Sequence, residues 1–235
     1  MIVYRGINIT DIAPVDIADI VVQTVKRSAV TRARPLQPGM EFVRITDQQR
    51  VINVTLADLT NDMESRISEI EAINAWAAGD EPGRLVLPSC DGKYFDAVCT
   101  QYIEPSFRQW WETKLKLVFT AYDPYYNSPA ENRLALGSAA RITGSAEPLV
   151  RIETVLESSA SGLAWTDGTN TLTLTGGTIP AGTVTVDLNR QTIMHSNGTS
   201  LSTMLTLASR FPPIKKVMEI TSASGGTLIW RERYV

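Results

Sequence analysis

The chain has 235 residues, of which 43% are hydrophobic and 20% charged, and its formal net charge is −3. These proportions are typical of folded globular proteins and exclude a disordered chain, while the length allows one large domain or two modest ones. The slightly acidic balance argues against sequence-independent binding to duplex DNA, which depends on the neutralisation of phosphates.

Nothing near the first residues resembles a secretion signal, because no basic stretch leads into an apolar segment. No run approaches the roughly 20 apolar residues that cross a bilayer. We therefore expect a protein that folds in the cytoplasm and has no membrane partner.

The two cysteines, Cys90 and Cys99, are too few for a disulfide framework and are not spaced as zinc ligands. A hairpin could bring them together, but a reducing compartment disfavours a lasting bond. We expect two reduced, partly buried thiols.

In chain order, the first predicted elements are strands. A short apolar run covers residues 17–25, and Ile52, Val54 and Leu56 then alternate with polar residues, as in a strand with one buried face. A further short run covers 84–87, and apolar residues alternate again over 115–119. These runs predict a mainly β first half.

One helix interrupts these strands, because apolar residues recur at helical spacing from Asn61 to Ala78. Asn61 is expected to cap the first turn, with Glu64 completing a capping box. Gly79 is expected to end the helix in the left-handed conformation.

Between Asn127 and Pro148 the chain is rich in Gly, Ser, Ala and Pro, which is typical of a connection. We predict an N-terminal domain at 1–130, a linker at 131–147 and a C-terminal domain at 148–235. Residues 1–128 hold 13 basic and 17 acidic side chains, and residues 129–235 hold 9 and 8. The first part is therefore acidic and the second nearly neutral.

The second half predicts short strands separated by glycine-containing turns, a pattern that suits an antiparallel sandwich. The strands are expected at 150–156, 171–175, 183–188 and 227–230.

No motif in the sequence predicts catalysis. His195 is the only histidine and precedes Ser-Asn-Gly, so we expect a solvated turn residue. Residues 177–184 have the glycine spacing of a phosphate loop but lack its lysine, and no Gly-x-Ser-x-Gly elbow is present. We expect no catalytic residue, no cofactor and no metal.

The only basic cluster consists of Lys26, Arg27, Arg32 and Arg34. Two interpretations stay open: a solvated loop between strands, or an arm that reaches acidic residues on a neighbouring copy.

Trp110 and Trp111 are adjacent and would point to opposite faces of a strand, so one of them is a candidate interface residue. A loop position for one of the two, or a sheet buried on both faces, is the alternative.

The ordered set of motifs resembles the distal tail protein family of long-tailed bacteriophages. The most specific stretch is 115–126, a strand followed by Asp-Pro-Tyr-Tyr. The other matching segments, in the family's order, are 53–56, the helix ending in Trp76-Ala77-Ala78-Gly79, 84–88, 93–97, 144–152 and 231–235. The opening Val3-Tyr4-Arg5-Gly6 keeps only part of the family's pattern.

The resemblance implies a β-rich α+β fold with an N-terminal belt domain, β-barrel-like with one α-helix, and a C-terminal galectin-like β-sandwich. Six belts would close into a ring that binds the tail tube protein on one face and the tail tip or baseplate hub protein on the other. Such a protein would be assembled in the host cytoplasm and reside in the virion tail, with DNA passing through the lumen without specific binding. The basic cluster at 26–34 is the candidate arm.

An alternative function is a carbohydrate-binding module that assists attachment to the host through the C-terminal sandwich. Lectin sandwiches stack an aromatic ring on the sugar, and Trp165 is the candidate residue. No inserted carbohydrate-binding module is present, which weakens this alternative.

Overall fold

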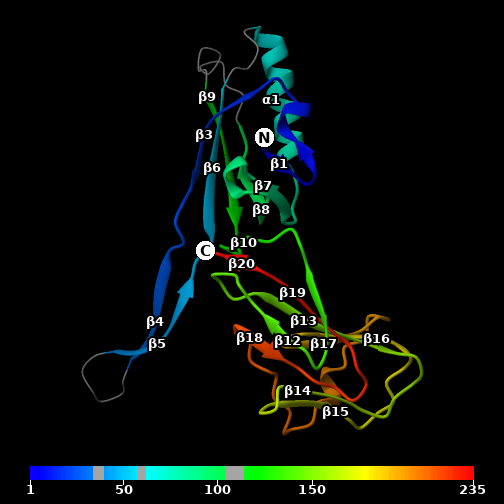
Figure 1. Ribbon diagram of the computed structural model, residues 1–235. Coiled ribbons are helices and arrows are strands. Elements are labelled where there is room, and N and C mark those ends of the chain that lie inside the picture. Colours follow the sequence, from blue (N-terminus) through cyan, green and yellow to red (C-terminus); the bar gives the residue numbers. More distant parts are fainter. Residues whose placement is uncertain (34–39, 58–61, 104–113) are drawn as a thin grey trace. The chain divides into compact units, whose positions relative to one another are not determined.

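The computed structural model describes residues 1–33, 40–57, 62–103 and 114–235, and it divides into two compact units (Figure 1). The N-terminal unit comprises Met1–Asn127 together with Val235, and the C-terminal unit comprises Ser128–Tyr234. Strands dominate both units, and the described part contains a single α-helix, so the predicted β-rich α+β class is confirmed. No helix in these residues is long and apolar enough to span a membrane.

The N-terminal unit is built on one antiparallel sheet with the strand order β2-β1-β7-β8-β9-β6-β3, and β10 also pairs with β8. The bounds are β1 Val3–Tyr4, β2 Ile7–Asn8, β3 Asp16–Val22, β6 Arg50–Ala57, β7 Gly83–Val86, β8 Tyr94–Gln101, β9 Lys114–Ala121 and β10 Tyr126–Asn127. Short 3-10 turns lie at Ile9–Asp11 and Pro88–Cys90.

The expected barrel-like closure is wrong for the described strands, because β2 and β3 remain at opposite ends of the sheet. The β1–β2 ladder pairs only two residues of each strand, whereas β3 offers a seven-residue edge. No ladder joins these two edges in the described chain, so the sheet is not closed into a cylinder.

The predicted alternation in β6 is confirmed, with Ile52, Val54 and Leu56 fully buried. In register with them, Phe119, Leu117 and Leu115 of β9 face the same core. The sheet thus has one apolar face that needs a cover.

Helix α1 (Met63–Ala77) contributes to that core through Ile70, Ile73 and Ala77, which are all buried within it. Trp76 makes edge-to-face contacts with Tyr4 and Phe119, with centroid distances of 5.7 and 6.3 Å. Its indole Nε1 donates to the carbonyl oxygen of Ile7 at 3.0 Å. Helix and strands therefore share one aromatic centre.

The predicted start of the helix is corrected by one residue. Asp62 is the N-cap, since its Oδ2 accepts from the backbone N–H of Ser65 at 3.0 Å, and Asn61 lies outside the described residues. A carboxylate at this position also complements the helix dipole.

The helix also ends differently from the prediction. Ala78 terminates it in an extended conformation. Arg5 Nη1 donates to the Ala78 carbonyl at 2.9 Å, and a Cβ at Gly79 would lie 1.9 Å from that nitrogen. Gly79 itself has φ +151°, a backbone conformation that residues with a Cβ rarely adopt, so glycine is favoured here.

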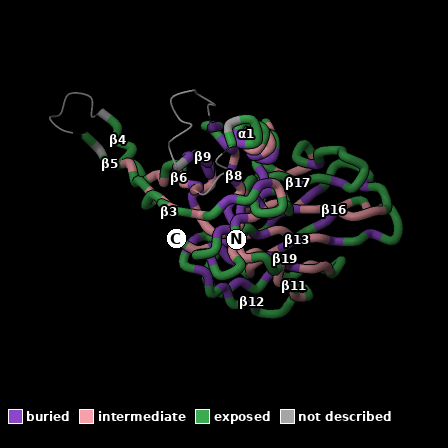
Figure 2. The backbone as a smooth tube through the Cα atoms, turned by 90° about the horizontal axis from the view of Figure 1, so that it is seen from above, coloured by how far each residue is buried: buried purple, intermediate pink, exposed green. Residues whose placement is uncertain are grey.

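The C-terminal unit contains a five-stranded antiparallel sheet with the order β11-β19-β13-β16-β17 and two smaller ladders, β12-β18 and β14-β15. The bounds are β11 Asn132–Ala135, β12 Ala139–Arg141, β13 Leu149–Leu156, β14 Leu163–Thr166, β15 Thr171–Leu174, β16 Gly182–Asp187, β17 Thr192–His195, β18 Val217–Glu219, β19 Thr227–Arg231 and β20 Arg233–Tyr234, with a 3-10 turn at Ser202–Met204. One core joins the sheet and both ladders, and Figure 2 shows buried residues alternating along the strands.

Glu232 holds one end of this unit together. The residue is only 7% exposed. Its carboxylate accepts hydrogen bonds from the backbone N–H groups of Thr143 and Gly144, at 3.1 and 2.6 Å, and from the indole N–H of Trp230 at 3.1 Å. A Cβ at Gly144 would lie 2.4 Å from the Arg233 carbonyl, so only glycine permits this approach. The carboxylate thus ties the segment before β13 to the end of β19.

We predict that Glu232→Gln lowers the free energy of unfolding of the C-terminal unit by about 2 kcal/mol, because the new NH₂ group faces N–H donors. Urea denaturation followed by tryptophan fluorescence measures the loss. Glu219→Gln, at an exposed carboxylate, is the matched control. Equal effects of the two substitutions would contradict the role of Glu232.

Candidate assembly surface

Strands β4 (Arg27–Ala33) and β5 (Met40–Asp47) form a hairpin, called the arm below, that pairs with no other strand of the described chain. Figure 1 shows it continuing from β3 and β6 and extending away from the sheet. None of the arm residues whose side chains are described is buried. The arm has no core of its own.

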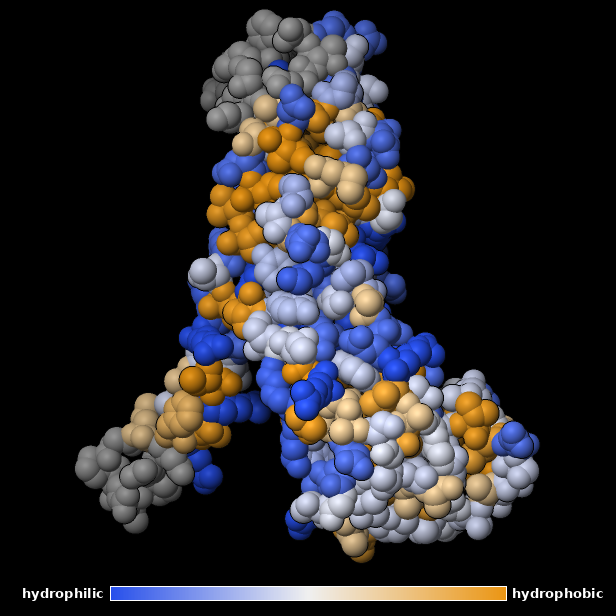
Figure 3. Space-filling view, viewed as in Figure 1, coloured by the Kyte–Doolittle hydropathy of each residue, from blue (hydrophilic) through white to orange (hydrophobic). Residues whose placement is uncertain are grey.

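The cross-strand register gives the arm two different faces. Ala29 lies opposite Ile45 and Thr31 opposite Phe42, so these four side chains share one face, and Met40 continues it. Met40, Phe42 and Ile45 are 66%, 60% and 54% exposed. Figure 3 shows hydrophobic residues gathered on the arm.

The opposite face is more polar and basic, with Ser28 opposite Thr46 and Val30 opposite Arg44, followed by Arg32. Arg32 and Arg44 are exposed, and neither forms an ion pair with a side chain that the structure describes. A bulge between Val30 and Thr31 interrupts the ladder opposite Val43.

This arrangement is unfavourable for an isolated chain, because a two-stranded hairpin alone is only marginally stable in water. Removing a large aliphatic or aromatic side chain from water contributes about 1.5–3 kcal/mol. Three such side chains stand uncovered on one face of the arm. The chemistry of the arm therefore suits docking onto another surface.

The structure resolves the two interpretations of the basic cluster in part. Arg27 and Arg32 lie in β4 rather than in a loop, and Lys26 directly precedes that strand. Arg27 pairs with Asp47 of the same chain at 3.1 Å. Arg34, Trp110 and Trp111 lie outside the described residues, so an interface role for all six candidates stays a prediction.

Strand β5 and its apolar side chains were not among the elements predicted from the sequence. The signal was present, since residues 41–47 read Glu-Phe-Val-Arg-Ile-Thr-Asp and are rich in β-branched and aromatic residues.

The predicted glycan contact at Trp165 is wrong. The side chain is fully buried, and its indole N–H donates to Thr154 Oγ1 at 3.0 Å. A ring in the core cannot stack on a sugar, so the carbohydrate-binding alternative loses its candidate residue.

The expectation of a solvated His195 is also wrong, because the residue is only 5% exposed. Its Nδ1 accepts the backbone N–H of Asn197 at 3.2 Å, which leaves the proton on Nε2 to be donated to the Pro180 carbonyl at 3.3 Å. A Cβ at Gly182 would lie 2.9 Å from the imidazole. His195 is a packed structural residue.

Both cysteines are free and more deeply buried than expected. Burial raises the pKa of the Cys90 thiol, and it raises that of Cys99 to about 11. Neither thiol has the lowered pKa of a nucleophile.

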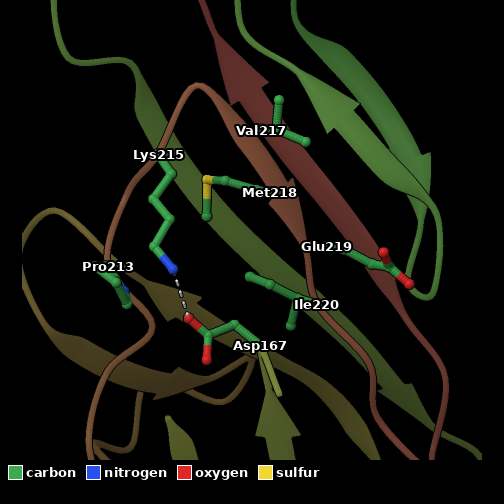
Figure 4. Close-up of a pocket in the computed structure, with 7 residues that line it drawn as sticks. All are labelled: Asp167, Pro213, Lys215, Val217, Met218, Glu219 and Ile220. Atoms are coloured by element: carbon green, nitrogen blue, oxygen red, sulfur yellow. Dashed lines mark hydrogen bonds and ion pairs between the residues drawn. The ribbon is translucent and has the colours of Figure 1, made fainter. Parts of the chain in front are cut away.

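A pocket of about 210 Å³ lies in the C-terminal unit (Figure 4). Its lining residues are Asp167, Pro213, Lys215, Val217, Met218, Glu219 and Ile220. The Lys215 ammonium pairs with Asp167 across it at 3.5 Å. In the described chain, no group of three or more His, Cys, Asp or Glu side chains could hold a metal ion.

Asp167 has a lowered pKa of about 2, chiefly because its Oδ1 accepts the backbone N–H of Asn170 at 2.6 Å. The backbone N–H of Thr169, the Asn170 amide and Lys215 also favour the charged form. Asp167 therefore organises the turn between β14 and β15.

No family model matches the chain, and no curated protein matches it in sequence. Among solved structures, the chain is similar to the SPP1 Dit (gp 19.1) protein, described as a paradigm of hub adsorption apparatus in Gram-positive infecting phages. The identity is 15% and the TM-score 0.75, over 100% of this chain and 98% of that chain. A chain of the phage P2 baseplate in its activated conformation with Ca aligns over 94% of this chain and 90% of that chain, at 7% identity and a TM-score of 0.44.

The SPP1 match spans both units and confirms, for the fold, the resemblance to distal tail proteins seen in the sequence.

We predict that Asp167→Asn destabilises the C-terminal unit at neutral pH but hardly at pH 2. A carboxyl whose pKa is lowered in the folded state stabilises that state when the pH is above the ordinary pKa of 3.8. This stabilisation disappears as the pH falls to the folded-state pKa of about 2. Urea denaturation at several pH values tests this, with Glu157→Gln as the exposed control. If the free energy of unfolding differed by the same amount between wild type and Asp167→Asn at every pH, the prediction would be contradicted.

Proposed function

We propose that this protein is a distal tail protein: a non-catalytic structural component of a phage tail that forms a hexameric ring between the tail tube and the tail tip or baseplate hub. The observation that carries the proposal is the uncovered apolar face of the arm. The similarity in fold to a phage hub protein over the whole chain supports it.

The arm favours a ring for a geometric reason. It projects from the sheet of its own chain, so a neighbouring copy is the natural cover for Met40, Phe42 and Ile45. An arm that docks on the body of the next copy forms a heterologous interface, and such interfaces close into rings when their rotation returns to the start. Six copies are the number that the family resemblance implies.

Charge supports a second copy as the partner. The arm presents Arg32 and Arg44, whereas residues 1–128 carry an acidic excess that includes the exposed Asp16 and Asp19 of the edge strand β3. Complementary charges would orient the arm during docking. Acidic side chains facing the lumen would repel passing DNA, so DNA would cross the ring without specific binding.

The two faces of such a ring would bind different partners, the tail tube protein on one side and the hub protein on the other. The protein would then be part of the virion tail.

We predict that the double substitution Phe42→Asp with Ile45→Asp abolishes the hexamer, because it places two charges on the face to be buried. Native mass spectrometry should give six times the 25.8 kDa chain mass for the wild type and a single chain for the variant. Far-UV circular dichroism shows whether the variant stays folded.

Val155→Asp is the matched control, because Val155 is 66% exposed on β13 of the other unit. A wild-type protein that stays a single chain at high concentration, or a double variant that still forms the hexamer, would contradict the proposal.

A further inference from the structure

The arm leaves the sheet at a short junction. The β3–β6 ladder ends at the pair Val22–Ile52, and the β4–β5 ladder begins at Arg27–Asp47. Between them, two backbone hydrogen bonds cross the ribbon, from Gln23 N–H to Val51 O at 3.0 Å and from Gln48 N–H to Lys26 O at 2.8 Å. The regular pairing is interrupted between the two ladders, so side-chain contacts contribute to fixing the direction of the ribbon.

One such contact comes from Tyr125, in the loop between β9 and β10. Its hydroxyl donates to Oδ2 of Asp47, the last residue of β5. Asp47 Oδ1 in turn pairs with Arg27 Nε, the first residue of β4, at 3.1 Å. The Asp47 side chain is 17% exposed and that of Arg27 is 62% exposed, so only the carboxylate of this ion pair is shielded from solvent. The Asp47 carboxylate thereby links Tyr125 to the base of both arm strands.

The neighbouring Tyr126 makes the second contact. Its ring lies 4.2 Å from that of Phe95, centroid to centroid, and the Arg50 guanidinium carbon lies 5.2 Å from the Tyr126 ring and 5.5 Å from the Phe95 ring. Arg50 is the first residue of β6 and only 5% exposed. Cation–π contacts of a desolvated guanidinium are among the stronger ones.

Tyr125 lies in a bend and Tyr126 begins β10, and their contacts with Asp47 and Arg50 hold both ends of the short connection between β5 and β6. Pro124 restricts the backbone just before them, and the Tyr125 N–H contacts Asp123 Oδ1 at 3.4 Å. The Asp-Pro-Tyr-Tyr stretch of the sequence is thus placed at the junction.

We propose that Tyr125 and Tyr126 act as a clamp that fixes the direction in which the arm leaves the sheet. They are positioning residues, because the arm forms the interface and the two tyrosines hold the arm in the direction in which it docks. The value of this for assembly rests on the proposed function, since an arm held in its docking direction loses less conformational entropy when it binds.

The test measures the direction of the arm in unassembled protein. Nitroxide labels are attached at Arg44→Cys on the arm and Glu71→Cys on α1, both exposed positions, in the Phe42→Asp/Ile45→Asp background. Pulsed electron paramagnetic resonance then gives the distribution of label distances. Protein without the introduced cysteines shows whether the buried Cys90 and Cys99 take up label.

Tyr125→Phe removes one hydroxyl and keeps the ring. Loss of a hydrogen bond to a carboxylate should raise the population of displaced arms about tenfold or more, which broadens the distribution. Tyr122→Phe is the matched control, because Tyr122 lies in the same segment and is 62% exposed. It should leave the distribution unchanged.

An unchanged distribution in Tyr125→Phe, or equal broadening in Tyr122→Phe, would overturn the clamp. The proposed function is judged separately by the mass of the wild-type protein. If the distance distribution broadens in Tyr125→Phe but the wild-type protein never assembles, the clamp is supported and the proposed ring is refuted.

Discussion

One constraint governs this molecule: a hairpin with a row of apolar side chains and no core must be covered from outside its own sheet. Met40, Phe42 and Ile45 share one exposed face, and the cationic Arg44 and Arg32 lie on the other. Leaving such a ribbon in water is costly, and a flat uncovered strand invites indiscriminate pairing. A defined docking site on a neighbouring copy removes both problems, which is why assembly explains the arm better than any activity.

The rest of the chain provides rigidity where the arm needs it. The Tyr4–Trp76–Phe119 cluster joins helix and sheet in the N-terminal unit, and Asp47 with Arg50 connects that body to the base of the arm. Buried polar groups elsewhere, such as the Glu232 carboxylate and the His195 imidazole, are occupied by backbone and side-chain partners. Their hydrogen-bonding capacity is used for structure, as the proposed structural role requires.

Local periodicity predicted the elements that pack on one face. The alternation at 52–56 and 115–119 and the helix near 61–78 follow from spacing alone, although the cap moved to Asp62 because two adjacent residues could both cap. An arm at 26–34 was one of the two interpretations of the basic cluster, but its hairpin form escaped prediction because Arg-Ser-Ala-Val-Thr-Arg becomes a strand only by pairing with residues 40–47. Exposure of Trp165 and His195 was misjudged because it depends on distant partners, Thr154 and Pro180.

Electron microscopy of the purified wild-type protein tests the central claim most directly, because it shows whether copies associate through a closed, repeating contact. The account predicts closed rings of six subunits in which the arm of each copy lies on the body of the next. Single particles of one chain, or assemblies in which the apolar face of the arm remains exposed to solvent, would contradict it.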